Sequence, residues 1–188
     1  RTINRSSSFF GNGLVVHVPF SDPFCPTLRN LMVDSINRQN VIGHDGGTYI
    51  AMEGPQFSTK AESNLYRSWG GDIIGMTALP EAKLAREAEI CYAILATASD
   101  YDCWRPEEDS VTADMIVSNL DKNVAVSQKI LLHVLKMLPD TRSCSCQDSL
   151  RHSFVTQITS VPDEIKEIMA PIIGKYMSPS CSTTTLKE

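Results

Sequence analysis

The apolar run Cys91-Tyr92-Ala93-Ile94-Leu95-Ala96 leads within a few residues to two aspartates, Asp100 and Asp102. Such a run predicts a buried strand over residues 91–99, with both carboxylates at its carboxyl end. In open α/β sheets, ligands bind beyond the carboxyl ends of the strands. A carboxylate pair there can accept hydrogen bonds from an amino-substituted heterocycle or donate a proton to a leaving group. The alternative is that the two aspartates only cap or solvate the loop.

Predicted strands and helices alternate along the first 138 residues. This alternation predicts an α/β fold in three layers, with helices on both sides of a mostly parallel or mixed central sheet. We expect one domain over 1–188, with a polar loop at 139–160, a helix at 161–177 that Pro171 can interrupt, and a polar tail at 178–188. The expected strands are 14–18, 48–52, 72–76 and 91–99, and the expected helices are 26–40, 59–69, 79–89 and 112–138. Thr59 and Glu62 have the spacing of a capping box at the start of the second helix.

Two further predicted strands also end in residues suited to a ligand. Phe57 and Ser58 follow the strand at 48–52, and an aromatic ring there can stack on a flat heterocycle for about 0.5–1.5 kcal/mol beyond burial. Met76 and Thr77 follow the strand at 72–76, where a hydroxyl at a helix N-terminus can meet an anion. The plain structural alternatives are a core phenylalanine and an ordinary helix cap. Taken together, the three strand ends predict a binding site at one edge of the sheet.

The charge and cysteine content exclude several classes of partner. The net charge is −5 and the basic residues are scattered, so we expect neither nucleic acid nor a membrane surface as a partner. The 6 cysteines and 4 histidines show no metal-ligand spacing, and we expect no metal site. We expect reduced thiols and a cytoplasmic location, with the nucleus as a second one. A disulfide within Cys144-Ser145-Cys146 stays open as an alternative.

The strand-end motifs resemble those of a known family. From Arg1 to about Leu138, in unbroken order, the chain is similar to the trimeric purine nucleoside phosphorylases, and within them to the branch that acts on S-methyl-5′-thioadenosine. The segments that carry this resemblance are Glu53-Gly54-Pro55-Gln56-Phe57-Ser58-Thr59-Lys60-Ala61-Glu62-Ser63, Trp69-Gly70, Gly75-Met76-Thr77, Pro80-Glu81, Leu84-Ala85, Glu87-Ala88 and Asp100-Tyr101-Asp102-Cys103-Trp104.

The resemblance implies a pentosyltransferase of purine and methionine salvage. Phosphate attacks C1′ of methylthioadenosine and releases adenine and 5-methylthioribose 1-phosphate. It implies no cofactor, with inorganic phosphate as co-substrate, and it implies a homotrimer. It also implies that the phosphate-binding loops belong to an N-terminal half that precedes Arg1, so we expect negligible phosphorolysis from residues 1–188 alone.

The resemblance also implies a role for individual residues. The two catalytic residues would be Asp100, which protonates purine N7, and Asp102, which accepts a hydrogen bond from the 6-amino group. The substrate-binding residues would be Phe57 on the base, Ser58 at its edge, Met76 under the ribose, Thr77 at the phosphate, Ser99 where threonine is commoner, and Ala113 and Ile116 around the 5′ substituent.

The carboxylate at position 100 has a consequence for the choice of base. Relatives that act on 6-oxopurines carry asparagine there, and an amide can donate to O6 whereas an ionised carboxylate cannot. Asp100 therefore favours adenine over hypoxanthine and guanine. Two alternatives stay open, namely a purine nucleoside phosphorylase of broader specificity and a purine-binding protein without turnover.

Overall fold

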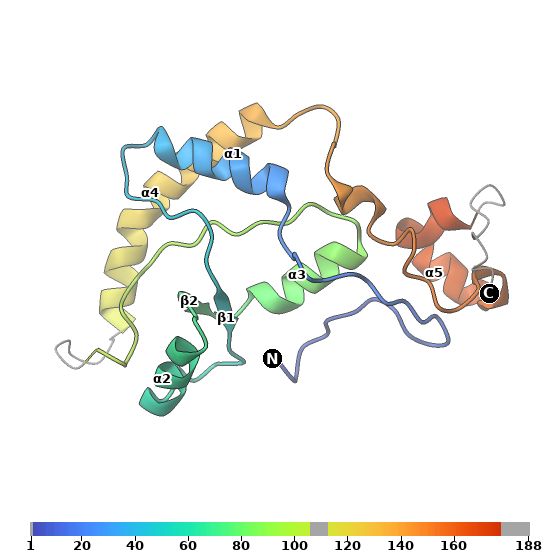
Figure 1. Cartoon of the computed structure of the whole chain (residues 1–188), viewed down its shortest axis with the longest axis horizontal. Helices are drawn as coiled ribbons and strands as arrows, with labels where there is room; N and C mark the ends of the chain where they lie inside the picture. Colours follow the sequence, from blue (N-terminus) through green and yellow to red (C-terminus); the bar gives the residue numbers. More distant parts are fainter. Residues whose placement is uncertain (1, 106–112, 178–188) are drawn as a thin grey trace.

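The computed structural model describes residues 2–105 and 113–177, and at its centre is a small parallel sheet (Figure 1). The strands β1 (Tyr49–Ala51) and β2 (Ile73–Gly75) pair in the register Tyr49↔Ile73 and Ala51↔Gly75. The helix α2 (Lys60–Ser68) connects them, and α3 (Ala78–Glu87) follows β2. This β-α-β-α order confirms the α/β class predicted from the alternating pattern.

Two of the predicted strands do not form in the described part of the chain. Residues 91–99 run extended without a strand ladder, and residues 14–18 contribute only an isolated antiparallel bridge between Val16 and Phe154. A strand needs a neighbour whose backbone supplies hydrogen-bond partners along its length, and an apolar run does not reveal whether one lies beside it. In the 91–99 run, the Tyr92 carbonyl accepts from the Cys25 amide at 2.7 Å.

The helices α1 (Pro26–Asn37) and α4 (Ala113–Met137) pack against each other. The Ser35 hydroxyl, fully buried in this contact, donates to the Ile130 carbonyl at 2.9 Å. Ile130 and Val134, one turn apart on α4, are also buried. Other apolar side chains of α4 are only partly covered, however. Among those that are exposed are Leu120, Val124, Leu131 and Leu135.

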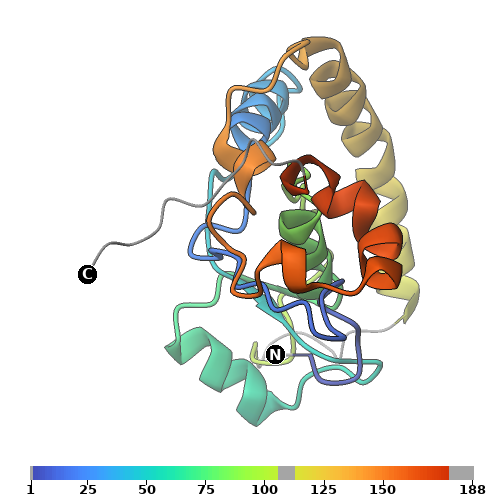
Figure 2. The same cartoon turned by 90° about the vertical axis from the view of Figure 1, so that its right-hand side faces the viewer.

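The C-terminal part of the chain forms a second cluster of helical turns at the far end of the molecule from α2 (Figures 1 and 2). It contains η1 (Ser145–Asp148), η2 (Ile158–Ser160), α5 (Asp163–Ile173) and η3 (Gly174–Tyr176). Its core joins Leu14 from the N-terminal segment to Val161, Met169 and Ile173. The helix α5 continues through Pro171, so the interruption considered at that residue does not occur.

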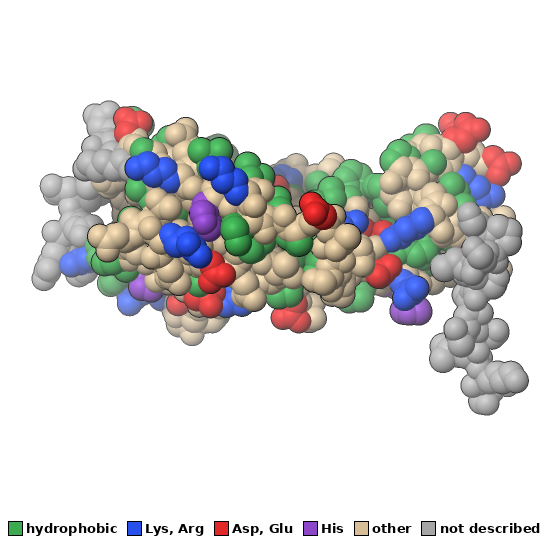
Figure 3. Space-filling view, turned by 90° about the horizontal axis from the view of Figure 1, so that it is seen from above, with side chains coloured by type: hydrophobic (Ala, Val, Ile, Leu, Met, Phe, Trp, Pro, Cys, Tyr) green, Lys and Arg blue, Asp and Glu red, His purple; other side chains and the backbone are tan. Residues whose placement is uncertain are grey.

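The tail at 178–188 lies outside the described residues, as do 106–112. Hydrophobic side chains reach the surface along the length of the face seen in Figure 3. Within residues 2–105 and 113–177, no helix has both the length and the hydropathy needed to cross a membrane.

Candidate functional site

The carboxylate of Asp100 is fixed by its own neighbours in the chain. The Asp102 amide donates to Asp100 Oδ1 at 2.8 Å, and the Ser99 hydroxyl donates to Asp100 Oδ2 at 2.5 Å. The first of these bonds makes an Asx turn, which suits the left-handed backbone of Asp102 at φ 61°. Asp100 therefore does cap the loop that follows residue 99, as the structural alternative in the sequence supposed. The turn also holds a half-buried carboxylate in one orientation.

Asp102 is held by the neighbouring helix α2. The hydroxyl of Ser63, a residue only 2% exposed, donates to Asp102 Oδ2 at 2.6 Å. The start of α2 is fixed by the predicted capping box, in which the Glu62 amide donates to Thr59 Oγ1 at 3.2 Å and the Thr59 amide donates to Glu62 Oε2 at 2.7 Å. No pattern in the sequence assigned a role to Ser63, although it ends the motif segment that runs from Glu53.

The segment that carries Phe57 and Ser58 lies beside the same turn. The Cys103 thiol donates to the Ser58 carbonyl at 3.4 Å, and the Ser58 hydroxyl lies 3.3 Å from Met52 Sδ. Burial, and then the nearby charge of Asp102, raise the pKa of Cys103. Phe57 itself is 62% exposed, so its ring is not a core side chain as the plain alternative supposed.

Gly54 brings the same segment against the end of β2. Its φ is +70°, and a Cβ at this position would lie 2.7 Å from Met76 Sδ. Any other side chain here would have to adopt a left-handed backbone conformation and displace the end of the Met76 side chain. The ends of β1 and β2 are thereby brought together, as the sequence predicted.

Thr77 lies at the N-terminal end of α3. Its side chain is exposed and makes no capping hydrogen bond. Thr77 is therefore not an ordinary side-chain cap, and its hydroxyl is left for other partners at the helix N-terminus, where anion binding stays a prediction.

Arg5 is a second residue at this edge that the sequence analysis missed. Its guanidinium donates to the carbonyls of Met76 and Glu53, and its Nε lies 3.6 Å from Glu53 Oε1. It thus joins the residues that follow β1 and β2, and it adds a positive charge near Thr77. Nothing in the sequence pattern connects a residue at position 5 with these two strand ends.

The helix α4 also contacts the end of the 91–99 run. The Asn119 amide group donates to the Ser99 carbonyl at 2.6 Å, and that of Asn123 donates to the Ala98 carbonyl at 3.2 Å. Ala113 and Ile116 lie in the first turns of this helix. Their side chains fall outside what the structure describes.

A second group of chemically active side chains lies away from this edge. The Sγ atoms of Cys25, Cys91, Cys144 and Cys146 all lie within 4.8 Å of one another, a group that could hold a metal ion. All four are free cysteines, so the disulfide considered within 144–146 is not formed. No pattern in the sequence indicated this group, and the expectation of no metal site failed to foresee it, because these cysteines lie on three separate segments that only the fold brings together.

The four thiols influence one another's ionisation. Burial, followed by contacts with neighbouring thiols, raises the pKa of Cys91 to about 11. Burial also acts to raise the pKa of Cys144, but hydrogen bonds with the Cys146 backbone and with neighbouring thiols bring it down to about 7.

Comparison with known proteins adds three findings. The family model of the Phosphorylase superfamily matches residues 1–136. The S-methyl-5′-thioadenosine phosphorylase of Koribacter versatilis is 49% identical over 176 residues, which cover 94% of this chain and 60% of the relative. The corresponding enzyme of Thermosynechococcus vestitus is 51% identical over 181 residues, which cover 94% of this chain and 63% of the relative.

Solved structures are similar as well. A methylthioadenosine phosphorylase from an antarctic soil metagenomic library has a TM-score of 0.84 at 39% identity, covering 91% of this chain and 61% of that one. Methylthioadenosine phosphorylase from Schistosoma mansoni in complex with adenine has a TM-score of 0.69 at 26% identity, covering 93% of this chain and 62% of that one. This chain thus spans 60–63% of the length of these relatives.

Proposed function

We propose a function from one premise: this chain belongs to the phosphorylase superfamily, whose family model matches residues 1–136. The protein cleaves S-methyl-5′-thioadenosine with inorganic phosphate and gives adenine and 5-methylthioribose 1-phosphate. The names of the relatives that are about half identical support this substrate. The observation that carries the proposal is the pair Asp100 and Asp102, held half-buried beside the start of α2, the helix that follows β1.

In the proposed reaction, a phosphate oxygen forms a bond to C1′ while the bond from C1′ to N9 breaks. The bonding electrons move into the purine ring, which becomes a better leaving group when N7 receives a proton. Asp100 supplies this proton or a hydrogen bond to N7. Its orientation is set by the Ser99 hydroxyl and the Asp102 amide, so no further ordering of the side chain is needed during the reaction.

Asp102 accepts a hydrogen bond from the 6-amino group of adenine in this proposal. The Ser63 hydroxyl bonds to its Oδ2 and so fixes which way the carboxylate faces. A 6-oxopurine would instead present a carbonyl oxygen to the Asp102 carboxylate, an acceptor that cannot donate to it, at a cost of a few kcal/mol. The proposed selectivity for aminopurines follows from this repulsion.

The remaining roles rest on exposure and position. The ring of Phe57 is 62% exposed and can pack on the base, with Ser58 beside it at the edge of the base. Met76 lies under the ribose in this proposal, and Thr77 donates its hydroxyl to the phosphate at the N-terminus of α3. Ala113 and Ile116 line the 5′ pocket.

We further propose that the protein is a homotrimer located in the cytoplasm. Large apolar side chains that are exposed in the single chain support an assembly, because a monomer rarely leaves so many of them in water. They include Leu131 at 43%, Leu132 at 58% and Leu135 at 63% exposure on α4. Light scattering of the purified protein would measure three times the chain mass.

The test uses the purified protein and measures adenine released from methylthioadenosine, with and without phosphate. We expect release only with phosphate. Asp100→Asn should lower kcat/KM for methylthioadenosine about 100-fold, corresponding to about 2.7 kcal/mol, and should raise activity on inosine. The matched control is Asp140→Asn, an exposed aspartate away from this edge, which should leave both activities unchanged.

Two results would count against the proposal. If Asp100→Asn leaves the preference for 6-aminopurines over 6-oxopurines unaltered, Asp100 does not select the base. Nucleoside binding that ignores phosphate and gives no adenine would favour the purine-binding alternative.

A further inference from the structure

The cluster of four cysteines joins parts of the chain that are far apart in sequence. Cys25 directly precedes α1, and Cys91 follows α3. Cys144 directly precedes η1, and Cys146 lies within it. The proposed phosphorolysis does not use any of them. We propose that these four cysteines bind one zinc ion as a structural site.

The spacing of the sulfur atoms fits a tetrahedral metal site. Zinc–sulfur bonds of about 2.3 Å place the four sulfurs of a ZnS₄ tetrahedron about 3.8 Å apart. The four Sγ atoms all lie within 4.8 Å of one another, and those of Cys91 and Cys144 are 3.3 Å apart. A disulfide requires about 2.05 Å. The sulfurs are thus gathered around one point rather than joined in pairs.

The burial of the cluster is that of a closed, structural site. Cys25 is 1% exposed and Cys146 is 4% exposed, while Cys91 and Cys144 are half-buried. Structural zinc sites take all four ligands from the protein and leave no open position for water or substrate. A hollow of about 230 Å³ lined by Ser145 and Cys146 lies beside the cluster and gives a metal ion a route in.

The surroundings can balance the charge of four thiolates around one zinc ion, which is −2 in total. Cys25 is the residue that caps α1, and the positive end of the helix dipole stabilises an anion there. The Cys25 amide donates to the Tyr92 carbonyl at 2.7 Å, which fixes the backbone of one ligand next to that of Cys91.

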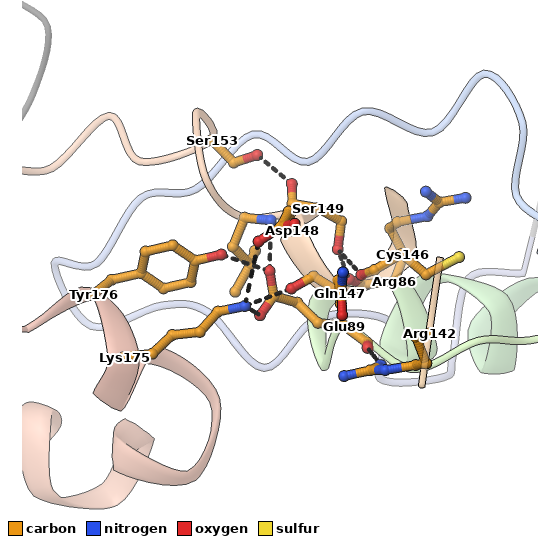
Figure 4. A network of polar contacts seen from close by, with 11 residues as sticks. Arg86, Glu89, Arg142, Cys146, Gln147, Asp148, Ser149, Ser153, Lys175 and Tyr176 are labelled. Carbon is orange, nitrogen blue, oxygen red and sulfur yellow. Dashed lines mark hydrogen bonds and ion pairs between the residues drawn. The ribbon is translucent and has the colours of Figure 1, made fainter. Parts of the chain in front are cut away.

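The site would attach the C-terminal segment to the rest of the chain. Cys25 and Cys91 lie within the residues that the family model matches, whereas Cys144 and Cys146 lie beyond its end at residue 136. A polar network around Glu89, close to Cys91 in sequence, makes the same connection (Figure 4). A metal that binds only the folded chain stabilises this attachment.

The test measures metal in the full protein, purified with reductant and without chelator. Elemental analysis should find about one zinc per chain. The double variant Cys144→Ser/Cys146→Ser should retain less than about one tenth of that zinc, because two of the four ligands are lost. The matched control Cys103→Ser changes an exposed cysteine outside the cluster and should keep the full zinc content.

A second measurement needs no variant that might misfold. Cobalt(II) added to the metal-free wild-type protein should give an intense sulfur-to-cobalt charge-transfer band and tetrahedral visible bands, and one equivalent of zinc should abolish both. Wild-type protein that binds neither ion under reducing conditions would overturn the proposal. So would two disulfides within the cluster, detected by intact mass before and after reduction. Iron at one equivalent instead of zinc would refute the choice of metal.

Discussion

Replacing Glu89 by alanine should strongly destabilise the attachment of the C-terminal segment. The Glu89 carboxylate is 8% exposed and accepts hydrogen bonds from the Leu150 amide at 3.0 Å and from the Tyr176 hydroxyl at 2.6 Å. Its other oxygen lies 2.7 Å from Lys175 Nζ (Figure 4). All three partners lie beyond residue 138, whereas Glu89 directly follows α3.

The size of the effect can be estimated contact by contact. The Leu150 amide, in a residue that is 0% exposed, loses its acceptor at a cost of about 1–3 kcal/mol. The bond from the Tyr176 hydroxyl to a charged acceptor contributes about 1.5–3 kcal/mol. Lys175 is 48% exposed and is rehydrated, so its ion pair adds only about 0–1 kcal/mol. We expect a loss of about 4 kcal/mol in the free energy of unfolding.

Urea denaturation at neutral pH measures this loss. Glu89→Gln keeps one acceptor oxygen and the same left-handed backbone at φ 56°, so it should cost about half as much as Glu89→Ala. Glu167→Ala changes an exposed glutamate on α5 and should alter stability by less than about 0.5 kcal/mol. Equal losses for Glu89→Gln and Glu89→Ala, or a loss below about 1 kcal/mol for Glu89→Ala, would refute this account of the network.

Three further substitutions test the candidate site. Thr59→Ala removes the cap of α2 and should cost about 1 kcal/mol of unfolding free energy in urea. Gly54→Ala combines a φ of +70° with a Cβ 2.7 Å from Met76 Sδ, and should cost more than about 1 kcal/mol by the same measurement. Ser63→Ala leaves Asp102 without its hydroxyl donor and should lower kcat/KM for methylthioadenosine about 10-fold, whereas Ser63→Thr retains the donor and most of the activity.

Each of these three has a result that contradicts it. Unchanged stability of Thr59→Ala would mean that the capping box contributes nothing. Unchanged stability of Gly54→Ala would mean that the loop can move away from the β2 end. If Ser63→Thr is as impaired as Ser63→Ala, the effect comes from packing rather than from the hydrogen bond to Asp102.

The elements that the sequence predicted correctly depend on signals a few residues apart. Pro26 at the first turn of α1 and the capping box at Thr59 each lie within one helical turn of the structure they specify. The strands β1 and β2 are short, but each ends at a glycine or proline turn that the sequence shows. The close approach of the segments that follow β1 and β2, seen at Gly54 and Met76, followed from the β-α-β order in the same way.

The features that were missed all depend on contacts between distant segments. The run at 91–99 has the composition of a strand, but a ladder needs a neighbour that no local pattern reveals. Arg5 meets Met76 across 71 positions, and Cys91 meets Cys144 across 53. Spacing rules for metal sites compare cysteines along one segment, so they do not detect four ligands that three segments supply.

The extended run itself connects the two regions that carry the proposals. Because residues 91–99 have no strand ladder, their position depends on contacts at each end. At the start, Glu89 and Cys91 are held by the C-terminal segment, and at the end α4 holds the Ser99 carbonyl while Ser63 holds Asp102. We therefore expect a change at the cysteine cluster to act on the start of a segment whose other end carries Asp100, so that Cys144→Ser/Cys146→Ser also lowers kcat/KM for methylthioadenosine.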